Sequence, residues 1–159
     1  MRLLSTGLLA FLATTAAAAS AATDAACDEI AAAIDDRVHT EWAKDYRSEV
    51  KSYWSTRLRD AKPACVVLPQ SAEEVSAVVK ILNKYPDVEF AVKSGGHTPA
   101  PRHSSVSGGV LISTRDMNGA TYDEETGTAY VKPGGEWNDV ISQLEEESGV
   151  AVVGGRLGM

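Results

Sequence analysis

The stretch Val92-Lys93-Ser94-Gly95-Gly96-His97-Thr98-Pro99 decides the fold of this chain of 159 residues. It follows an alternating apolar run, Val88, Phe90 and Val92, which is typical of a half-buried strand. The two glycines lack a Cβ, so the backbone can take positive φ there and turn successive N–H groups toward one point. Such a concavity suits a phosphate or pyrophosphate, with His97 at its rim as a nucleophile or general base. An ordinary glycine turn with a solvated histidine is the alternative that the stretch alone leaves open.

A β-α-β unit leads into this loop. Cys65–Leu68 predicts a short buried strand that ends at Pro69. Ser71 and Glu74 have the spacing of a capping box, and the helix that they start carries four apolar residues at one-face spacing: Val75, Val78, Val79 and Leu82. The strand over 88–92 completes the unit. The loop therefore lies at the carboxyl end of a strand, where ligands of open α/β sheets commonly bind.

Beyond the loop the pattern predicts more strands and one more helix. The expected strands are Gly109–Ser113, the hairpin pair Ala120–Tyr122 and Thr128–Lys132, and a last strand Val150–Val153. The expected helix follows Pro133-Gly134-Gly135 and carries Trp137, Val140, Ile141 and Leu144 on one face, with Gly149 as its stop. The fold class is α/β (α+β), in the order β-α-β-β-β-β-α-β after an N-terminal helical extension.

That extension is expected to span residues 22–60, ahead of a domain over 61–159. A helix is predicted over Thr23–Ile34, with Thr23 or Asp24 as its cap. A second is predicted over Ser48–Asp60, with Val50, Tyr53, Trp54 and Leu58 on one side. Trp54 is interpreted as a core anchor. Residues 35–47 are ambiguous.

Residues 1–21 have the pattern of a secretory signal peptide. Arg2 supplies the positive start, Leu3–Leu12 the apolar segment and Ala17–Ala21 a small-residue cleavage site. The apolar run is too short for a membrane anchor. The chain is therefore expected to be secreted and extracellular.

The net charge limits the classes of partner that the chain can bind, and the cysteine content indicates how its cysteines are used. Without Arg2 the formal net charge goes from −7 to −8, with no basic cluster, which argues against nucleic acid or a membrane as partner. Cys27 and Cys65 are the two cysteines, and in a secreted chain such a pair is most simply one disulfide. Free thiols or a metal site are the less favoured alternatives, because no further soft ligands lie nearby.

Several separated motifs agree in order and spacing with one known family. They are the segments 63–69, 71–75, 92–97, 108–112, 117–118 and 131–137. Together they resemble the first half of the PCMH-type FAD-binding domain of the vanillyl-alcohol-oxidase superfamily. The resemblance is closest to secreted fungal oxidases similar to berberine bridge enzyme, and it covers roughly Ser48–Met159.

The resemblance implies FAD as cofactor, with no metal. It implies a pyrophosphate loop and a second glycine-rich loop, whose binding residues are Lys93, Ser94, Gly95, Gly96, His97, Thr98, Gly154, Gly155 and Gly158. In the family the histidine at the position of His97 is often bonded to the 8α-methyl group of the flavin. Residues 154–159 contain no cysteine, so a second covalent link is not supported.

The activity implied is an FAD-dependent oxidoreductase that oxidises a small-molecule alcohol, sugar or amine, with dioxygen as electron acceptor. The rest of the FAD domain, the substrate domain and the usual catalytic base are expected after Met159. No catalytic residue is therefore assigned, and the chain alone is expected not to turn over substrate. A secreted non-catalytic module of the same fold is the alternative.

Other sites are less favoured. Arg102 is interpreted as solvated rather than phosphate-binding, and His97 with His103 lacks a third metal ligand. Lys93 can face either the cofactor or solvent. No nucleophile-elbow motif surrounds Ser104 or Ser105, and no G-x-G-x-x-G motif follows the first strand, which disfavours hydrolase and NAD-binding folds.

Overall fold

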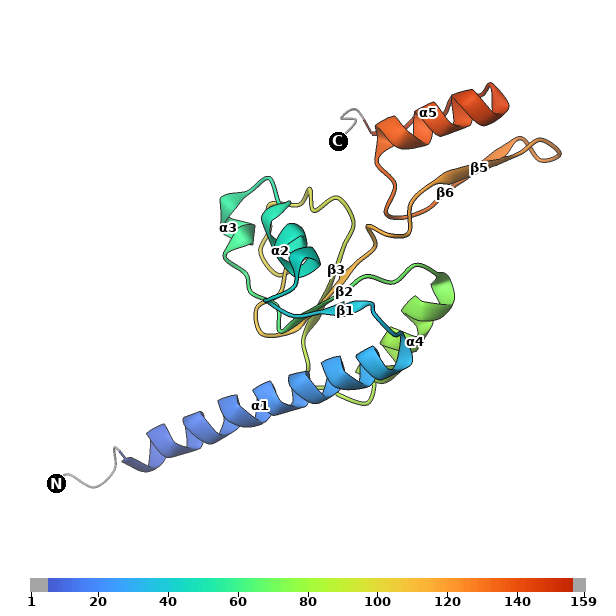
Figure 1. Ribbon diagram of the computed structural model, residues 1–159. Helices are drawn as coiled ribbons and strands as arrows, with labels where there is room; N and C mark the ends of the chain where they lie inside the picture. Colours follow the sequence, from blue (N-terminus) through green and yellow to red (C-terminus); the bar gives the residue numbers. More distant parts are fainter. Residues whose placement is uncertain (1–5, 156–159) are drawn as a thin grey trace.

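The structure is a computed structural model that describes residues 6–155, with side chains described from residue 20 onward (Figure 1). Arg2 of the predicted signal peptide and Gly158 of the predicted second loop lie outside the described residues. In the described part of the chain, no helix has both the length and the apolar character needed to cross a membrane.

A four-stranded sheet forms the centre of the molecule. Its order is β1 (Val38–His39), β2 (Cys65–Val67), β4 (Val110–Ser113), β3 (Phe90–Lys93). The last three are parallel, with Cys65 and Phe90 both in register with Val110, and β1 runs antiparallel to β2. Because parallel strands share their direction, β2, β3 and β4 all end at the same edge of the sheet, where the 94–109 loop begins.

One face of the sheet is covered by α1 (Thr6–Ala33) and α4 (Ala72–Leu82). Their apolar side chains pack on alternate strand residues in one core, whose members include Ala26, Ile30, Val67, Val78, Ile81, Val110 and Ile112. The predicted disulfide is present and joins Cys27 of α1 to Cys65 of β2, with their Cα atoms 6.3 Å apart. The disulfide covalently links the N-terminal helix to the sheet that this helix covers.

The predicted capping box starts α4. The Ser71 Oγ accepts a hydrogen bond from the Glu74 N–H at 3.2 Å. The Glu74 carboxylate reaches back to the N–H of Gln70, at 2.7 Å, one residue ahead of the cap. The helix face differs slightly from the prediction, because Ile81 is buried whereas Val79 is 39% exposed.

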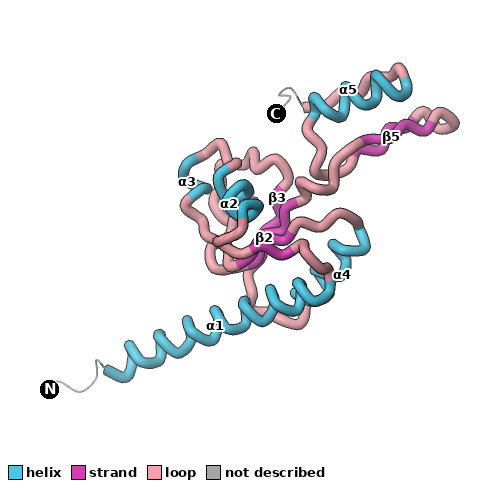
Figure 2. Tube along the Cα trace, viewed as in Figure 1, coloured by secondary structure: helices cyan, strands magenta, loops and turns pink. Residues whose placement is uncertain are grey.

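The opposite face of the sheet is covered by α2 (Lys44–Lys51), which continues into the short α3 (Thr56–Arg59). Tyr46 and Val50 of α2 pack with Val66, Leu68, Ala91, Val106 and Leu111 in a second core. Figure 2 shows the 94–109 loop as an unbroken stretch without helix or strand on the side of α2 and α3. The glycine loop and the N-terminal extension therefore lie close together.

A smaller layer extends from the sheet through the chain after β4. It consists of the hairpin β5 (Ala120–Asp123) and β6 (Thr128–Val131) with α5 (Trp137–Ser148) packed on it. Ala120, Val140 and Leu144 form its buried core. Gly149 ends α5 at φ 66°, in the left-handed conformation expected of a C-terminal glycine stop. In Figure 1 this layer stands apart from α1 and α4, on the far side of the sheet edge.

Four sequence predictions were wrong in detail. The helix predicted over Ser48–Asp60 is two helices broken at 52–55, and the first begins at Lys44, in the ambiguous segment. The first helix does not begin at Thr23 or Asp24 but runs through them. Residues 150–153 form no strand.

The fourth concerns β3, which begins at Phe90 and not at Val88: Val88 is buried, but the next two apolar residues of the predicted pattern are not. Phe90 and Val92 are 49% and 51% exposed, whereas Ala91 and Lys93 are buried. The reason is that β3 is the edge strand of the sheet. The side of β3 that faces α2 packs against the second core and the buried Glu49 carboxylate. Its other side lies beyond the part of the sheet that α1 and α4 cover.

Candidate functional site

The predicted pyrophosphate loop leaves the end of β3 as an exposed turn. Ser94, Gly95 and His97 are exposed, whereas Gly96 is buried. Gly96 has a φ of 68°, and a Cβ there would lie 2.9 Å from the Tyr53 ring and 3.2 Å from Lys93 Cε. Only glycine therefore fits at this position without displacing its neighbours. Gly95 has no positive φ, so the sequence prediction holds for one of the two glycines.

The His97 imidazole folds back over Gly95. A Cβ at Gly95 would lie 2.8 Å from His97 Cδ2 and 3.1 Å from Nε2. The His97 carbonyl accepts a hydrogen bond from the Trp54 indole, with a Nε1 to oxygen distance of 3.2 Å. The ring of His97 thus lies on the outer surface of the loop while its backbone is held by the N-terminal extension.

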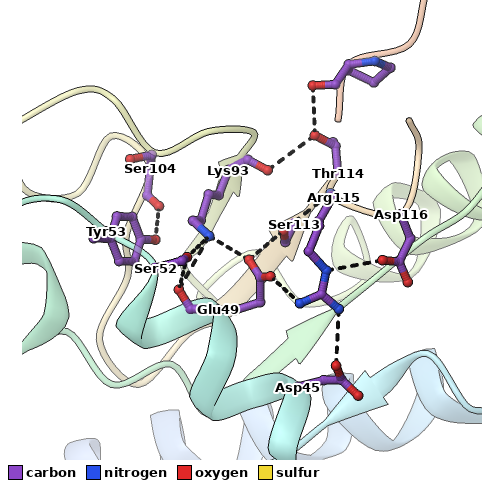
Figure 3. A network of polar contacts seen from close by, with 11 residues as sticks. Asp45, Glu49, Ser52, Tyr53, Lys93, Ser104, Ser113, Thr114, Arg115 and Asp116 are labelled. Atoms are coloured by element: carbon purple, nitrogen blue, oxygen red, sulfur yellow. Dashed lines mark hydrogen bonds and ion pairs between the residues drawn. The ribbon is translucent and has the colours of Figure 1, made fainter. Parts of the chain in front are cut away.

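The sequence left open whether Lys93 faces the cofactor or solvent, and the structure shows that it does not face solvent. Its side chain is 4% exposed, and its Nζ lies 2.6 Å from Oε2 of Glu49, which is 2% exposed (Figure 3). The ammonium also donates to the Ser52 hydroxyl at 2.7 Å and lies 4.9 Å from the centre of the Tyr53 ring. Lys93 therefore supports the loop from inside the protein.

The Glu49 carboxylate is satisfied by three side-chain donors. Besides Lys93, Oε2 accepts from the Ser113 hydroxyl at 2.7 Å, and Oε1 accepts from Nη1 of Arg115 at 2.7 Å. Burial lowers the pKa of the Arg115 guanidinium, but the hydrogen bonds to Asp116 and Asp45 and the charges of Glu49 and Asp116 outweigh this effect, so its pKa is raised overall. This cluster joins α2 to the ends of β3 and β4.

Tyr53 lies directly beneath the loop. Its ring is 1% exposed, and its hydroxyl donates to the carbonyl of Ser104, in the same long loop as His97. Burial, together with the nearby Glu49 charge, raises the pKa of this phenol well above its ordinary value. The hydroxyl therefore stays protonated, and a hydrogen-bond donor, around neutral pH.

A second glycine turn, Pro133-Gly134-Gly135, meets the first. The Ser94 hydroxyl donates to the Pro133 carbonyl at 2.6 Å. Thr114, which directly follows β4, lies between the two turns, with its Oγ1 3.3 Å from the Lys93 carbonyl and 3.2 Å from the Pro133 carbonyl. A Cβ at Gly134 would lie 1.8 Å from the Thr114 carbonyl oxygen, so this backbone approach requires glycine.

The described part of the predicted second glycine-rich loop, Gly154 and Gly155, packs on the indole of Trp137. A Cβ at Gly154 would lie 2.2 Å from Cε3 of that ring, and one at Gly155 would lie 2.4 Å from its Nε1. Trp137 begins α5 directly after the 133–135 turn, so Gly154 and Gly155 lie against the start of that helix. The contacts of Ser94 and Thr114 join the first two glycine turns to each other.

Of the remaining candidates, Arg102 lies outside the glycine turns and Thr98 belongs to the first of them. Arg102 is exposed, as predicted, and pairs with Glu89, and the Thr98 hydroxyl accepts from the Ala100 N–H at 3.3 Å. No group of three or more metal-ligating side chains occurs among the described residues. A cavity of about 390 Å³ lies between α3 and the 101–107 loop, and none of the residues 94–98 lines it.

Sequence reasoning missed Glu49, Thr114 and the role of Tyr53, and it misplaced Trp54. Trp54 is 59% exposed and is not a core anchor. The one local signal that could have indicated Glu49 is the lysine within the predicted strand region. A lysine is almost never fully buried unless it is paired, so a buried Lys93 requires a partner. Nothing near Glu49 in sequence distinguishes it from a solvated helix residue.

Comparison with known proteins identifies the family. The profile of a family described as an FAD binding domain matches residues 63–156. An uncharacterised FAD-linked oxidoreductase of Arthroderma benhamiae is 42% identical over 114 residues, covering 72% of this chain and 23% of the relative. The FAD-dependent monooxygenase sdcF of Emericella nidulans is 36% identical over 131 residues, covering 82% of this chain and 27% of the relative.

Solved structures show the same fold. A variant of berberine bridge enzyme superposes with a TM-score of 0.69 at 21% identity, covering 82% of this chain and 28% of that one. Phl p 4, a grass pollen allergen with glucose dehydrogenase activity, gives a TM-score of 0.60 at 17% identity, covering 75% and 26%. The chain spans about a quarter of the length of these relatives. It belongs to the FAD-binding domain family of FAD-linked oxidoreductases, and it matches their N-terminal part.

Proposed function

We propose that the chain is the FAD-holding front part of a secreted FAD-dependent oxidoreductase, and that residues 94–98 hold the pyrophosphate of the cofactor. The observation that carries this proposal is the exposed glycine turn at the end of β3, with Gly96 at a φ of 68°. Its outer surface is backbone, the Ser94 hydroxyl and the His97 ring. Backbone N–H groups presented at such a turn are suited to an anion.

The chemistry of the surrounding residues is compatible with an anionic group. Neither 92–99 nor 131–135 contains an Asp or Glu, so the two turns that meet through Ser94 and Pro133 bring no carboxylate with them. The nearest buried carboxylate, Glu49, is fully taken up by Lys93, Ser113 and Arg115. A pyrophosphate at the outer surface of the 94–98 loop therefore meets no carboxylate of that loop, and the carboxylate next to the second turn is the exposed Glu136.

His97 is the candidate for covalent attachment of the flavin. Its ring lies on the exposed side of the loop and its backbone is held at the carbonyl, so the imidazole is free to meet a group bound there. FAD, when bound, supplies the oxidising chemistry, and the protein contributes binding, orientation and tuning of the flavin. The substrate proposed for the whole enzyme is a small-molecule alcohol, sugar or amine, with dioxygen as acceptor.

An absorbance spectrum of the secreted, purified chain tests this proposal. Flavin bands that remain with the protein after acid precipitation are expected for FAD linked through His97. In the matched variant His97→Ala the bands should pass to the supernatant while the intact protein still binds FAD. A folded protein that takes up no flavin from solution would contradict the proposal, and a non-catalytic module of the same fold would then be the better description.

A further inference from the structure

The connection between α2 and α3 contacts the glycine loop at several points. Within it, three consecutive residues, Ser52, Tyr53 and Trp54, each contact the 93–104 segment through a different group. The Ser52 hydroxyl accepts from Lys93, the Tyr53 hydroxyl donates to Ser104 and the Trp54 indole donates to His97. This break between the two helices is therefore where the N-terminal extension meets the candidate site.

The exposure of Trp54 is unusual for a tryptophan that only stabilises the fold. With 59% of its surface exposed, it contributes little to either core of the sheet, yet its one polar atom is bonded to the backbone of His97. Trp42 provides the contrast within the same extension. It is 80% exposed, and no hydrogen bond to the glycine loop accompanies it.

Tyr53 lies on the buried side of the loop, and its ring limits the conformations that the loop can adopt. Its ring fills the space that a side chain at Gly96 would need, at 2.9 Å from the ideal Cβ position. The same ring lies 4.9 Å from the Lys93 ammonium, a distance typical of a cation–π contact. Lys93 is in turn bonded to Glu49 of α2, so the residues on both sides of the loop's first turn are fixed to the extension.

We propose that Tyr53 and Trp54 are positioning residues that hold the Gly96–His97 backbone in its ligand-ready conformation before any cofactor arrives. The inference rests on the proposed function of the loop as an FAD site. A loop that is already ordered loses less conformational freedom on binding, so the effect of these residues is on affinity. Neither residue is assigned a contact with the cofactor.

The test uses the variant Trp54→Phe, which keeps an aromatic ring and removes the N–H that bonds His97. Trp42→Phe is the matched control, since it makes the same change at another exposed site of the extension. All three proteins also carry His97→Ala, which removes the candidate covalent link and keeps the backbone carbonyl that Trp54 bonds, and backbone amide order parameters of residues 95–98 are measured by NMR in the ligand-free chains. We expect values near about 0.85 in the wild type and in Trp42→Phe, and values below about 0.6 in Trp54→Phe. Thermal unfolding should be the same in all three proteins.

Binding of added FAD is then measured for the same three proteins. Trp54→Phe is expected to bind about three- to tenfold more weakly, the loss typical of one hydrogen bond, and Trp42→Phe to bind as the wild type does. Equal order parameters in Trp54→Phe and the wild type would overturn the proposal, as would equal affinities. If the wild type binds no FAD but the order parameters differ as expected, the positioning role stands and the proposed function fails.

Discussion

The Lys93 ammonium lies 2.6 Å from the Glu49 carboxylate, and neither side chain is more than 4% exposed. The two residues are 44 positions apart in the chain, one in α2 and one at the end of β3. Removing two charges from water is costly, and the arrangement repays that cost here because every oxygen of the carboxylate has a donor. The pair fixes the N-terminal extension to the strand that carries the glycine loop.

Glu49→Gln should destabilise the protein by about 3–5 kcal/mol, because it leaves the Lys93 ammonium buried without its counter-charge. Urea unfolding followed by circular dichroism measures the change. The double variant in which Glu49 and Lys93 both become Met should recover much of the lost stability, since it removes both charges together. A Glu49→Gln protein as stable as the wild type would show that the pair is not buried in solution.

Gly96→Ala should cost more stability than Gly95→Ala. At Gly96 the positive φ alone costs an alanine about 1–2 kcal/mol, and the added Cβ must displace the buried Tyr53 ring. At Gly95 the added Cβ meets only the imidazole of His97, the end of an exposed side chain that can rotate away. Unfolding midpoints of the two variants test this order, and a larger loss for Gly95→Ala would contradict the described loop conformation.

Reduction of the Cys27–Cys65 disulfide should lower the free energy of unfolding by about 3–4 kcal/mol, the chain-entropy value for a loop of this length. The double variant Cys27→Ala/Cys65→Ala should show a similar loss without reductant. Urea unfolding with and without dithiothreitol gives both numbers. Reductant should have no effect on the double variant, which serves as the control for other actions of the reagent.

The ion pair between Glu29 and Lys84 should stabilise the protein over a wide pH range. In acid this contribution should be lost. The hydrogen bonds from Lys84 and Tyr85 lower the pKa of Glu29 below its ordinary 4.5, and the bond to Glu29 raises the pKa of Lys84 above its ordinary 10.5. The contribution of Glu29 is therefore fully present above pH 4.5 and is lost as the pH falls through the lower, folded-state pKa. That of Lys84 is present below pH 10.5 and is lost as the pH rises through the higher one.

The variant Glu29→Gln checks this dependence. The stability difference between wild type and variant should be constant between about pH 5 and 10 and should shrink toward zero in acid. Thermal unfolding at a series of pH values measures it. A difference that persists unchanged at pH 2 would show that packing, and not the charge of Glu29, is responsible.

Local sequence patterns predicted the elements that local forces determine. The capping box at Ser71, the left-handed stop at Gly149 and the β-α-β unit around the loop all depend on residues within a few positions of one another. The disulfide followed from the number of cysteines. The resemblance to a known family supplied the role of the glycine loop, which the octapeptide alone left open.

The predictions that failed depend on distant residues. The alternating pattern gave the wrong buried side for Phe90 and Val92, because Lys93 is buried instead by its partner on α2. The helix break after Lys51 places Ser52 and Tyr53 against the loop, a contact between segments more than 40 residues apart. Trp54 was predicted to lie in a core because tryptophans are usually buried. In the structure its indole instead donates a hydrogen bond to the backbone carbonyl of His97.

Because β3 lies at the edge of the sheet, its buried lysine also affects the tendency of the protein to aggregate. Within the described residues β3 is an edge strand, and an edge strand with two half-exposed apolar side chains, Phe90 and Val92, is a template for pairing with another chain. Short edge strands with an inward-pointing charge resist such pairing, and β3 has four residues and ends in Lys93. The buried Lys93, paired with Glu49, thus also disfavours growth of the sheet from molecule to molecule.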